Sequence, residues 1–348
     1  MSRYFGPVFI DDIITPTQIS IFEISTTVTF VLGVISLSCY GYMVVWHTPS
    51  FMGDFKKMLL VYISASFVFQ VSYACLKPLL LQPFNVIYPV GYVAPMDKVT
   101  CLCIWFLVIV WSYITMVDSL FFIILERYFL VTIPVFPNMK YVRNFICSFL
   151  IISNIVISPL LVVLLIPKLP DEAEMAAVFS KTIIGFEKYL QWQPSLLYMP
   201  RSDETGILKV LIPIGVVFLV PRVLAFICLI PANIYQVKKL GNQASVISRK
   251  RLDVMTQVVY LQTTEMLVFY IIPTGLVLST YVIDYGYYRN FGFLCTMLIQ
   301  MGTFSPVIDF CIMTTFITSY RNTVISMFCK KKKNPSVTIP PQEIPQVS

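Results

Sequence analysis

Seven long apolar runs constrain this chain more than any other feature of its sequence. Their approximate bounds are Phe22–Trp46, Met58–Leu81, Val99–Leu125, Phe145–Ile166, Ile207–Ile234, Val254–Thr280 and Phe291–Ile317. About 20 apolar residues are enough for an α-helix to cross the hydrocarbon core of a bilayer. Backbone polar groups find no partners in lipid, so each run must satisfy its own hydrogen bonds as a helix. The sequence therefore predicts an all-α membrane protein, a bundle of seven transmembrane helices.

The composition agrees with a lipid environment. Charged residues make up 12% of the 348 residues, and the mean hydropathy is +0.79. Soluble domains carry about 25% charged residues, so this chain has too few charges for a water-exposed surface. The cysteines lie mostly inside the apolar runs and show no metal-type spacing, so we expect them to pack as small hydrophobes. We expect neither a metal nor a cofactor.

The distribution of basic residues predicts the orientation of the bundle. Most of the 25 lysines and arginines fall in the segments that would face the cytoplasm if the N-terminus were outside. The long segment from Pro167 to Gly206, which would then lie outside, is rich in acidic residues. The positive-inside rule thus favours an extracellular N-terminus and a cytoplasmic C-terminus. This placement also accounts for the net charge of +7, so we expect no nucleic-acid partner.

We expect the chain to have four parts. Residues 1–21 form an extracellular N-terminus, 22–317 the bundle, 318–333 a short amphipathic basic helix beside the membrane, and 334–348 a disordered cytoplasmic tail. The lysines of the third part would lie near anionic lipid headgroups, although a simply solvated charge run has the same sequence. Cys329 is a weak candidate for palmitoylation.

The sequence Glu126-Arg127-Tyr128 stands at the predicted inner end of the third run. An acidic residue beside an arginine at a helix end can hold the arginine in one state and release it in another. The alternative is an ordinary interfacial charge pair. The position of the tripeptide favours a switch that couples the bundle to a cytoplasmic partner.

Prolines interrupt the later runs. Pro273 lies in the sixth run and Pro306 in the seventh, where each frees a carbonyl and allows a kink. Asp309 follows Pro306 by one helical turn, and a carboxyl within a membrane span indicates a functional residue. We expect Pro273, Pro306 and Asp309 to belong to the switch, with Asp309 close to Arg127.

Three further charged residues lie inside predicted spans: Asp118, Arg222 and Glu265. Asp118 precedes Arg127 by a distance of roughly 13 Å along the helix, and Arg222 lies at a compatible depth in the fifth run. Burying either charge alone would cost several kcal/mol. We expect a structural ion pair between Asp118 and Arg222, with Glu265 as the alternative partner of the arginine.

Nothing in the sequence indicates catalysis. The one histidine, His47, follows the first run, and no nucleophile elbow, phosphate loop or zinc-protease motif occurs. We therefore expect a receptor, not an enzyme. A proton relay through Asp118, Glu265 and Asp309 keeps a secondary transporter as a lesser alternative.

Three segments resemble the Str superfamily of nematode serpentine chemoreceptors. The stretch from His47 to Leu60 is similar to the first inner loop of that superfamily, Gln262–Pro273 to its sixth helix, and Pro306–Arg321 to its seventh helix. The resemblance extends over Ile21–Phe328, with class H (Srh) nearest and class I (Sri) second. It implies a receptor of the plasma membrane in sensory-neuron cilia that detects small molecules and signals through a heterotrimeric G protein.

The sequence departs from rhodopsin-like receptors at several positions. Ser305 replaces the usual asparagine before the proline of the seventh helix, and Ile271 stands where a tryptophan is usual before Pro273. The segment Pro167–Gly206 has no cysteine, so the usual disulfide to the third helix cannot form there. The sequence leaves open how the outer mouth of the bundle is held.

A receptor of this kind would bind its ligand in the outer half of the bundle. Tyr113 lies roughly 21 Å above Arg127, and Ile109 shares its face. We expect Ile109, Tyr113, Tyr270 and Gln300 to contact ligand, although core packing is the plainer role for each. Arg249, Lys250 and Arg251 would join Arg127 in contacting the G protein. A receptor for an internal peptide or hormone remains the main alternative.

Overall fold

The computed structural model describes residues 8–48, 53–82, 86–132, 138–171, 173, 175, 183–185, 194–198, 220, 222–225, 227–229, 231–232, 235, 257–258, 260–282 and 290–328. Five helical stretches within these residues are long and apolar enough to cross a membrane: Pro16–His47, Lys56–Leu76, Lys98–Glu126, Met139–Lys168 and Phe291–Phe316. They correspond to the first four predicted runs and the seventh. The fifth run lies mostly outside the described residues, and the sixth is helical from Tyr260 to Val282.

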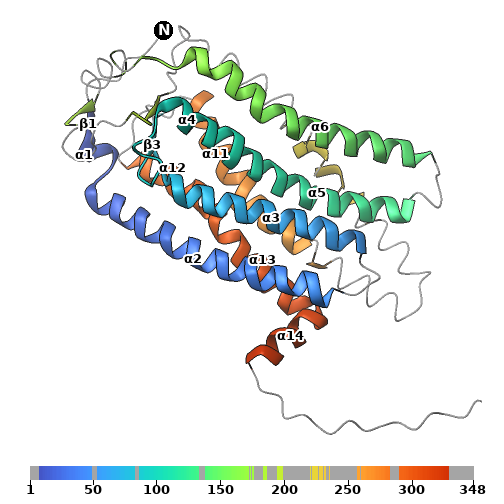
Figure 1. Cartoon of the computed structure of the whole chain (residues 1–348). Helices are drawn as coiled ribbons and strands as arrows, with labels where there is room; N and C mark the ends of the chain where they lie inside the picture. Colours follow the sequence, from blue (N-terminus) through green and yellow to red (C-terminus); the bar gives the residue numbers. More distant parts are fainter. Residues whose placement is uncertain are drawn as a thin grey trace, which may run out of the picture.

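The helices run side by side along one direction, as Figure 1 shows. Spans one to four are α2 (Pro16–His47), α3 (Gly53–Leu76), the continuous series α4 (Lys98–Cys103), η2 (Ile104–Val110) and α5 (Trp111–Thr132), and α6 (Met139–Leu165), which ends in η3 (Ile166–Lys168). Span six contains η4 (Leu267–Ile271) and α11 (Ile272–Val282), and span seven comprises α12 (Phe291–Met301), η5 (Gly302–Phe304) and α13 (Ser305–Phe316). A final helix, α14 (Thr318–Phe328), follows span seven.

Local sequence determines where span one begins. The Thr15 side chain accepts a hydrogen bond from the Gln18 backbone, and the Gln18 side chain accepts one from the Thr15 backbone. This reciprocal capping box satisfies two amide groups that a helix start leaves free, and Pro16 fits the first helical position. Span one therefore starts at Pro16, before the predicted start at Phe22.

Span two ends earlier than predicted. The expected helix extended to Leu81, but α3 stops at Leu76 and Lys77 adopts a left-handed φ of 43°. The cause is Pro78, because a residue before proline is disfavoured in the α-helical region. The next four residues, Pro78–Leu81, form strand β2.

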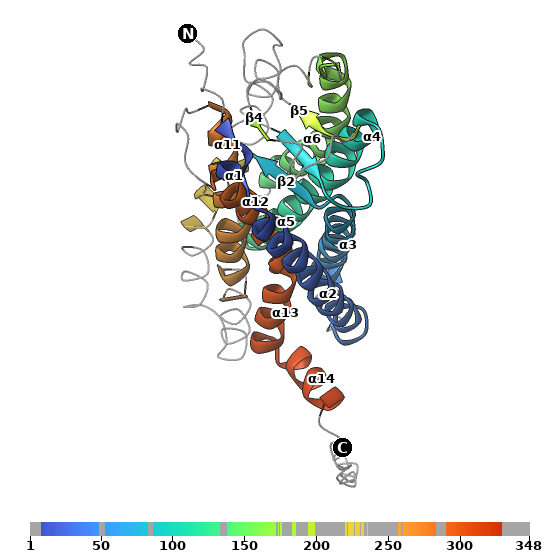
Figure 2. The same ribbon diagram turned by 90° about the vertical axis from the view of Figure 1, so that its left-hand side faces the viewer.

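Short strands close the end of the bundle at which the N-terminus lies (Figure 2). Strand β2 (Pro78–Leu81) pairs antiparallel with β3 (Val86–Pro89), which pairs with β5 (Leu197–Tyr198), and β1 (Val8–Phe9) pairs parallel with β4 (Ile183–Ile184). The prediction of an all-α chain did not include these strands. Together with α1 (Ile10–Ile13), they form a layer that we call the cap.

The cap has a hydrophobic core of its own, separate from that of the helices. Its buried members are Ile10, Ile13, Ile14, Phe22, Leu79, Leu81, Val86, Tyr88, Met175, Ile183 and Leu196. The Thr296 hydroxyl of α12 accepts a hydrogen bond of 2.9 Å from the Leu80 amide, and the cysteines of the described residues are free thiols. Packing and backbone pairing therefore hold this end of the described bundle, which answers the question that the sequence left open.

The opposite end carries α14, which follows α13 at an angle to it (Figure 2). The Ser319 hydroxyl donates to the His47 carbonyl at 2.9 Å, and the hydroxyls of Tyr320 and Thr48 lie 2.7 Å apart. Burial raises the pKa of the Tyr320 phenol, so this group stays protonated at neutral pH. These contacts attach α14 to the end of span one.

The close backbone contact between Gly91, which follows β3, and the end of α3 yields a stability prediction. A Cβ added at Gly91 would collide with the Cys75 carbonyl oxygen, whereas one at Gly275 would meet nothing within 4 Å. We expect Gly91→Ala to destabilise the protein by about 1–3 kcal/mol through overpacking. The matched control Gly275→Ala should be neutral or slightly stabilising, because it replaces a glycine within a helix. Thermal unfolding in detergent measures both variants, and equal melting temperatures would contradict the prediction.

Candidate functional site

A buried ion pair links spans three and five. The Arg222 Nε donates to Asp118 Oδ1 at 2.9 Å, and Nη2 donates to Asp118 Oδ2 at 3.0 Å. The same Nη2 also donates to the Ser153 hydroxyl of α6 at 2.7 Å. Arg222 and Asp118 are 7% and 3% exposed. The structure thus joins Arg222 to Asp118, not to Glu265, and attaches both to span four.

A second polar group lies at the centre of the bundle, between spans two, six and seven. Tyr62 donates a hydrogen bond to Asp309 Oδ2, and the Gln262 amide donates to Asp309 Oδ1 at 3.3 Å. The Tyr62 hydroxyl also lies 3.3 Å from that of Ser305. Glu265 interacts with Asp309 and lies beside Ser305. We call Tyr62, Gln262, Glu265, Ser305 and Asp309 the carboxyl cluster.

Glu265 differs from the other members of the carboxyl cluster. It is 4% exposed, and neither carboxyl oxygen has a hydrogen-bond partner of acceptable geometry. The Asp309 side chain is fully buried and accepts bonds from two residues. The cluster therefore holds one satisfied carboxyl and one unsatisfied carboxyl a short distance apart.

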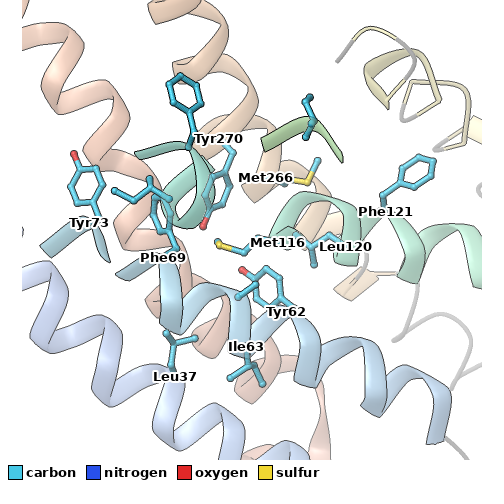
Figure 3. Packing of buried hydrophobic residues seen from close by; sticks show 14 of the residues in the cluster. Leu37, Tyr62, Ile63, Phe69, Tyr73, Met116, Leu120, Phe121, Met266 and Tyr270 are labelled. Atoms are coloured by element: carbon cyan, nitrogen blue, oxygen red, sulfur yellow. The ribbon is translucent and has the colours of Figure 1, made fainter. Parts of the chain in front are cut away.

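Aromatic side chains lie beside the carboxyl cluster, between spans three and six. The rings of Tyr113 and Tyr270 meet edge to face, with centroids 5.3 Å apart, and Phe69 lies 6.2 Å from Tyr113. The Tyr113 hydroxyl lies 2.8 Å from that of Thr274. In Figure 3 the hydroxyls of Tyr62 and Tyr270 point toward the same central region near Met116.

Two of the four expected ligand residues are brought together by this arrangement. Tyr113 and Tyr270 touch, and Ile109 is buried one helical turn away from Tyr113. Gln300 faces span one instead, where its amide donates to the Ser25 hydroxyl at 2.8 Å. Gln300 therefore lies on the side of span seven that faces span one, not on the side where Tyr113 and Tyr270 meet.

Sequence reasoning missed a polar row between spans one, two and seven. The Gln70 amide donates to the Thr303 carbonyl at 2.6 Å, and the hydroxyls of Thr303 and Thr29 lie 3.1 Å apart. Gly33 makes room for this contact, since a Cβ there would lie 3.1 Å from the Gln70 side chain. The signal was available, because Gln70 is an isolated amide within an apolar run.

Spans six and seven are irregular beside the carboxyl cluster. The π-helical turn η4 ends two residues before Pro273, and the 3₁₀ turn η5 ends two residues before Pro306. Such turns within α-helices mark hinges and functional sites. Tyr270 belongs to η4, and a Cβ on Gly302 of η5 would lie 3.2 Å from its ring. The two irregular turns therefore pack against each other.

The predicted coupling residues are described in part. Glu126 forms an ion pair with Arg143 of α6, with Oε1 and Nε 2.9 Å apart. Tyr128 packs edge to face on Phe129, with centroids 5.5 Å apart. The backbone of Arg127 is helical, but its side chain lies outside the described residues, as do Arg249, Lys250, Arg251 and Cys329. The predicted proximity of Asp309 to Arg127 therefore stays a prediction.

One comparison identifies relatives of the chain. A family model described as the serpentine type seven-transmembrane GPCR chemoreceptor Srh matches residues 18–330. No curated protein matches the sequence. The family match covers the described spans except for the first two residues of α2, and it agrees with the resemblance to class H receptors noted from the sequence.

The ion pair generates a prediction about stability. Arg222→Met would leave Asp118 buried and uncompensated, which costs about 3–5 kcal/mol. We expect this variant and Asp118→Leu each to lose most cell-surface expression. The double variant should recover part of the loss, because it removes both charges. A double-mutant cycle on surface expression and melting temperature measures the coupling, and additive losses would count against the pair.

Proposed function

The chain belongs to the Srh family of serpentine seven-transmembrane chemoreceptors, and on that premise we propose that it detects a small molecule and signals through a heterotrimeric G protein. The contact of Tyr113 with Tyr270 between spans three and six carries the proposal. It joins a candidate ligand site to the irregular part of span six. The plasma membrane of sensory-neuron cilia is the proposed location.

The orientation we propose places the N-terminus and the cap outside and α14 in the cytoplasm. Its support is the excess of lysine and arginine in the segments that would face the cytoplasm. We keep the four proposed parts of the chain, with the bundle at 22–317 and the basic helix at 318–333. In this orientation the lysines after Phe328 would lie near anionic lipid headgroups.

Ligand would bind among Ile109, Tyr113 and Tyr270, with Gln300 reached only if its bond to Ser25 opens. Small-molecule sites are mostly apolar with a few well-placed polar groups. The hydroxyls of Tyr113 and Thr274 supply such polar groups among aromatic rings. A ligand that competes for this contact would loosen span six from span three.

Loosening span six would change the cytoplasmic end of the bundle. A ligand shifts the equilibrium only if it binds one arrangement more tightly than the other. The turns before Pro273 and Pro306 provide places at which spans six and seven can bend. Glu126, Arg127 and Tyr128, with Arg249, Lys250 and Arg251, would form the surface that meets the G protein.

The alternatives make different predictions. A receptor for an internal peptide or hormone would couple to a G protein but be expressed away from sensory endings. A secondary transporter would show substrate flux that depends on Asp118, Glu265 or Asp309. A functional fluorescent fusion in the intact animal separates these cases. Signal in ciliated sensory endings supports chemoreception, and signal confined to gut or muscle contradicts it.

The coupling role of Arg127 is testable in a G-protein activation assay. We expect Arg127→Ala to reach the cell surface at the normal level and to lose most ligand-stimulated signalling. Lys98→Ala, which removes a basic residue at the capped end of span three, is the control and should signal normally. Full signalling by Arg127→Ala at equal surface expression would overturn this assignment.

The contact between Tyr113 and Thr274 gives a prediction about ligand response. Tyr113→Phe removes one neutral hydrogen bond, worth about 0.5–1.5 kcal/mol, so the half-maximal ligand concentration should shift by roughly 2- to 13-fold. Tyr73→Phe is the matched control, because the Tyr73 hydroxyl is buried without a hydrogen-bond partner. Dose–response curves with the first ligand from a panel of volatile and water-soluble compounds measure both. Equal shifts in the two variants would contradict the assignment of Tyr113 to the ligand site.

A further inference from the structure

Two carboxyl groups from different spans approach each other in the core of the bundle. Asp309 of span seven is 0% exposed, and Glu265 of span six is 4% exposed. Asp309 accepts hydrogen bonds from Tyr62 and Gln262, but neither oxygen of Glu265 has a partner. An unpartnered, buried carboxyl beside a second carboxyl requires an explanation that the receptor function does not supply.

The described groups that surround the two carboxyls carry no positive charge. They are Tyr62 of α3, Tyr270 of η4, Gln262 and Ser305, with Tyr40 of α2 and Tyr320 of α14 farther out. Among the described residues, no lysine, arginine or histidine forms an ion pair with Glu265 or Asp309. Arg222, a described intramembrane cation, is engaged by Asp118. Two ionised carboxylates would therefore repel each other without compensation from any of these described groups.

Burial of two such negative charges is far costlier than retention of a proton. An isolated carboxylate in a low-dielectric interior becomes neutral instead of staying ionised, and two adjacent carboxyls do not both ionise. A bound sodium ion would be the other way to neutralise the pair, but such an ion needs a shell of several oxygens around it. Both Glu265 oxygens are fully buried without a hydrogen-bond partner, and the groups that interact with them are Ser305 and Asp309. A proton needs one acceptor and fits these surroundings better than an ion that needs several.

We propose that Glu265 and Asp309 form a proton-binding site that joins span six to span seven. The proton resides on the Glu265 carboxyl, which faces the Asp309 carboxylate, while Tyr62 and Gln262 donate to Asp309 and favour its ionised form. The protonated Glu265 then donates to Asp309 when the side chains close the gap. The pair carries one negative charge in place of two and draws the two spans together.

The site makes the receptor's conformational equilibrium depend on pH. The closed arrangement buries Glu265 and binds the proton tightly, whereas displacement of span six admits water and releases the proton. Acid therefore stabilises the closed arrangement, and alkali favours the open one. For one coupled proton, the ratio of open to closed receptor changes by at most about tenfold per pH unit.

Infrared difference spectroscopy on purified full-length receptor in lipid nanodiscs tests the site without any need for signalling. We expect a carboxylic C=O band at neutral pH that disappears in Glu265→Gln and persists in Glu23→Gln, which removes a carboxyl outside the cluster. If Glu265→Gln does not fold, Asp309→Asn should shift the same band. Absence of the band at neutral pH would overturn the proposal. Loss of the band when sodium replaces N-methylglucamine would also overturn it, because the site would then bind sodium instead of a proton.

A functional measurement then tests the coupling, which depends on the proposed G-protein signalling. Basal signalling of the unmodified receptor should rise with pH, and that of Glu265→Gln should not change with pH. A C=O band in a receptor that shows no signalling would contradict the proposed function but support the proton-binding site. If signalling responds equally to pH in the two receptors, proton binding at Glu265 does not influence the conformational change. That result would contradict the coupling.

Discussion

Lipid supplies no hydrogen bonds, so a polar side chain that its own helix does not satisfy is stabilised by a partner on a neighbouring span. This constraint determines which spans are adjacent. Arg222 joins Asp118 and Ser153, which ties spans three, four and five together. Gln70 joins Thr303, which ties span two to span seven. Apolar packing between helices is interchangeable with lipid contact, whereas these pairs specify one arrangement.

The sequence predicted the spans well because their signal is local. Apolar runs alone identified the four spans from α2 to α6 and span seven, and depth arithmetic matched Asp118 with Arg222. The cap was not predictable in the same way. Its strands β1 and β4 belong to segments far apart along the chain, and each is too short for a periodic pattern. Pro78, by contrast, is a residue from which the end of α3 could have been predicted.

The candidate site was only partly predictable, because a sequence gives the depth of a residue better than the direction it faces. Tyr113 and Tyr270 face each other, as the ligand hypothesis requires. Gln300, at a similar depth, faces span one. The π-helical turn η4 changes the facing of residues along span six relative to a regular helix, and no sequence pattern announces it. The partners of Asp309 were missed for the same reason.

The 3₁₀ turn in span seven has a mechanical consequence. Its three residues, Gly302–Phe304, are wound more tightly than an α-helix, so rewinding them would rotate the rest of the span by about 60° and shorten it by about 1.5 Å. The far end cannot follow freely, because α14 is fastened to span one. The extended residue Ile317, which joins α13 to α14, would absorb the twist. A change of winding at Gly302–Phe304 would thus rotate α13 relative to both α12 and α14.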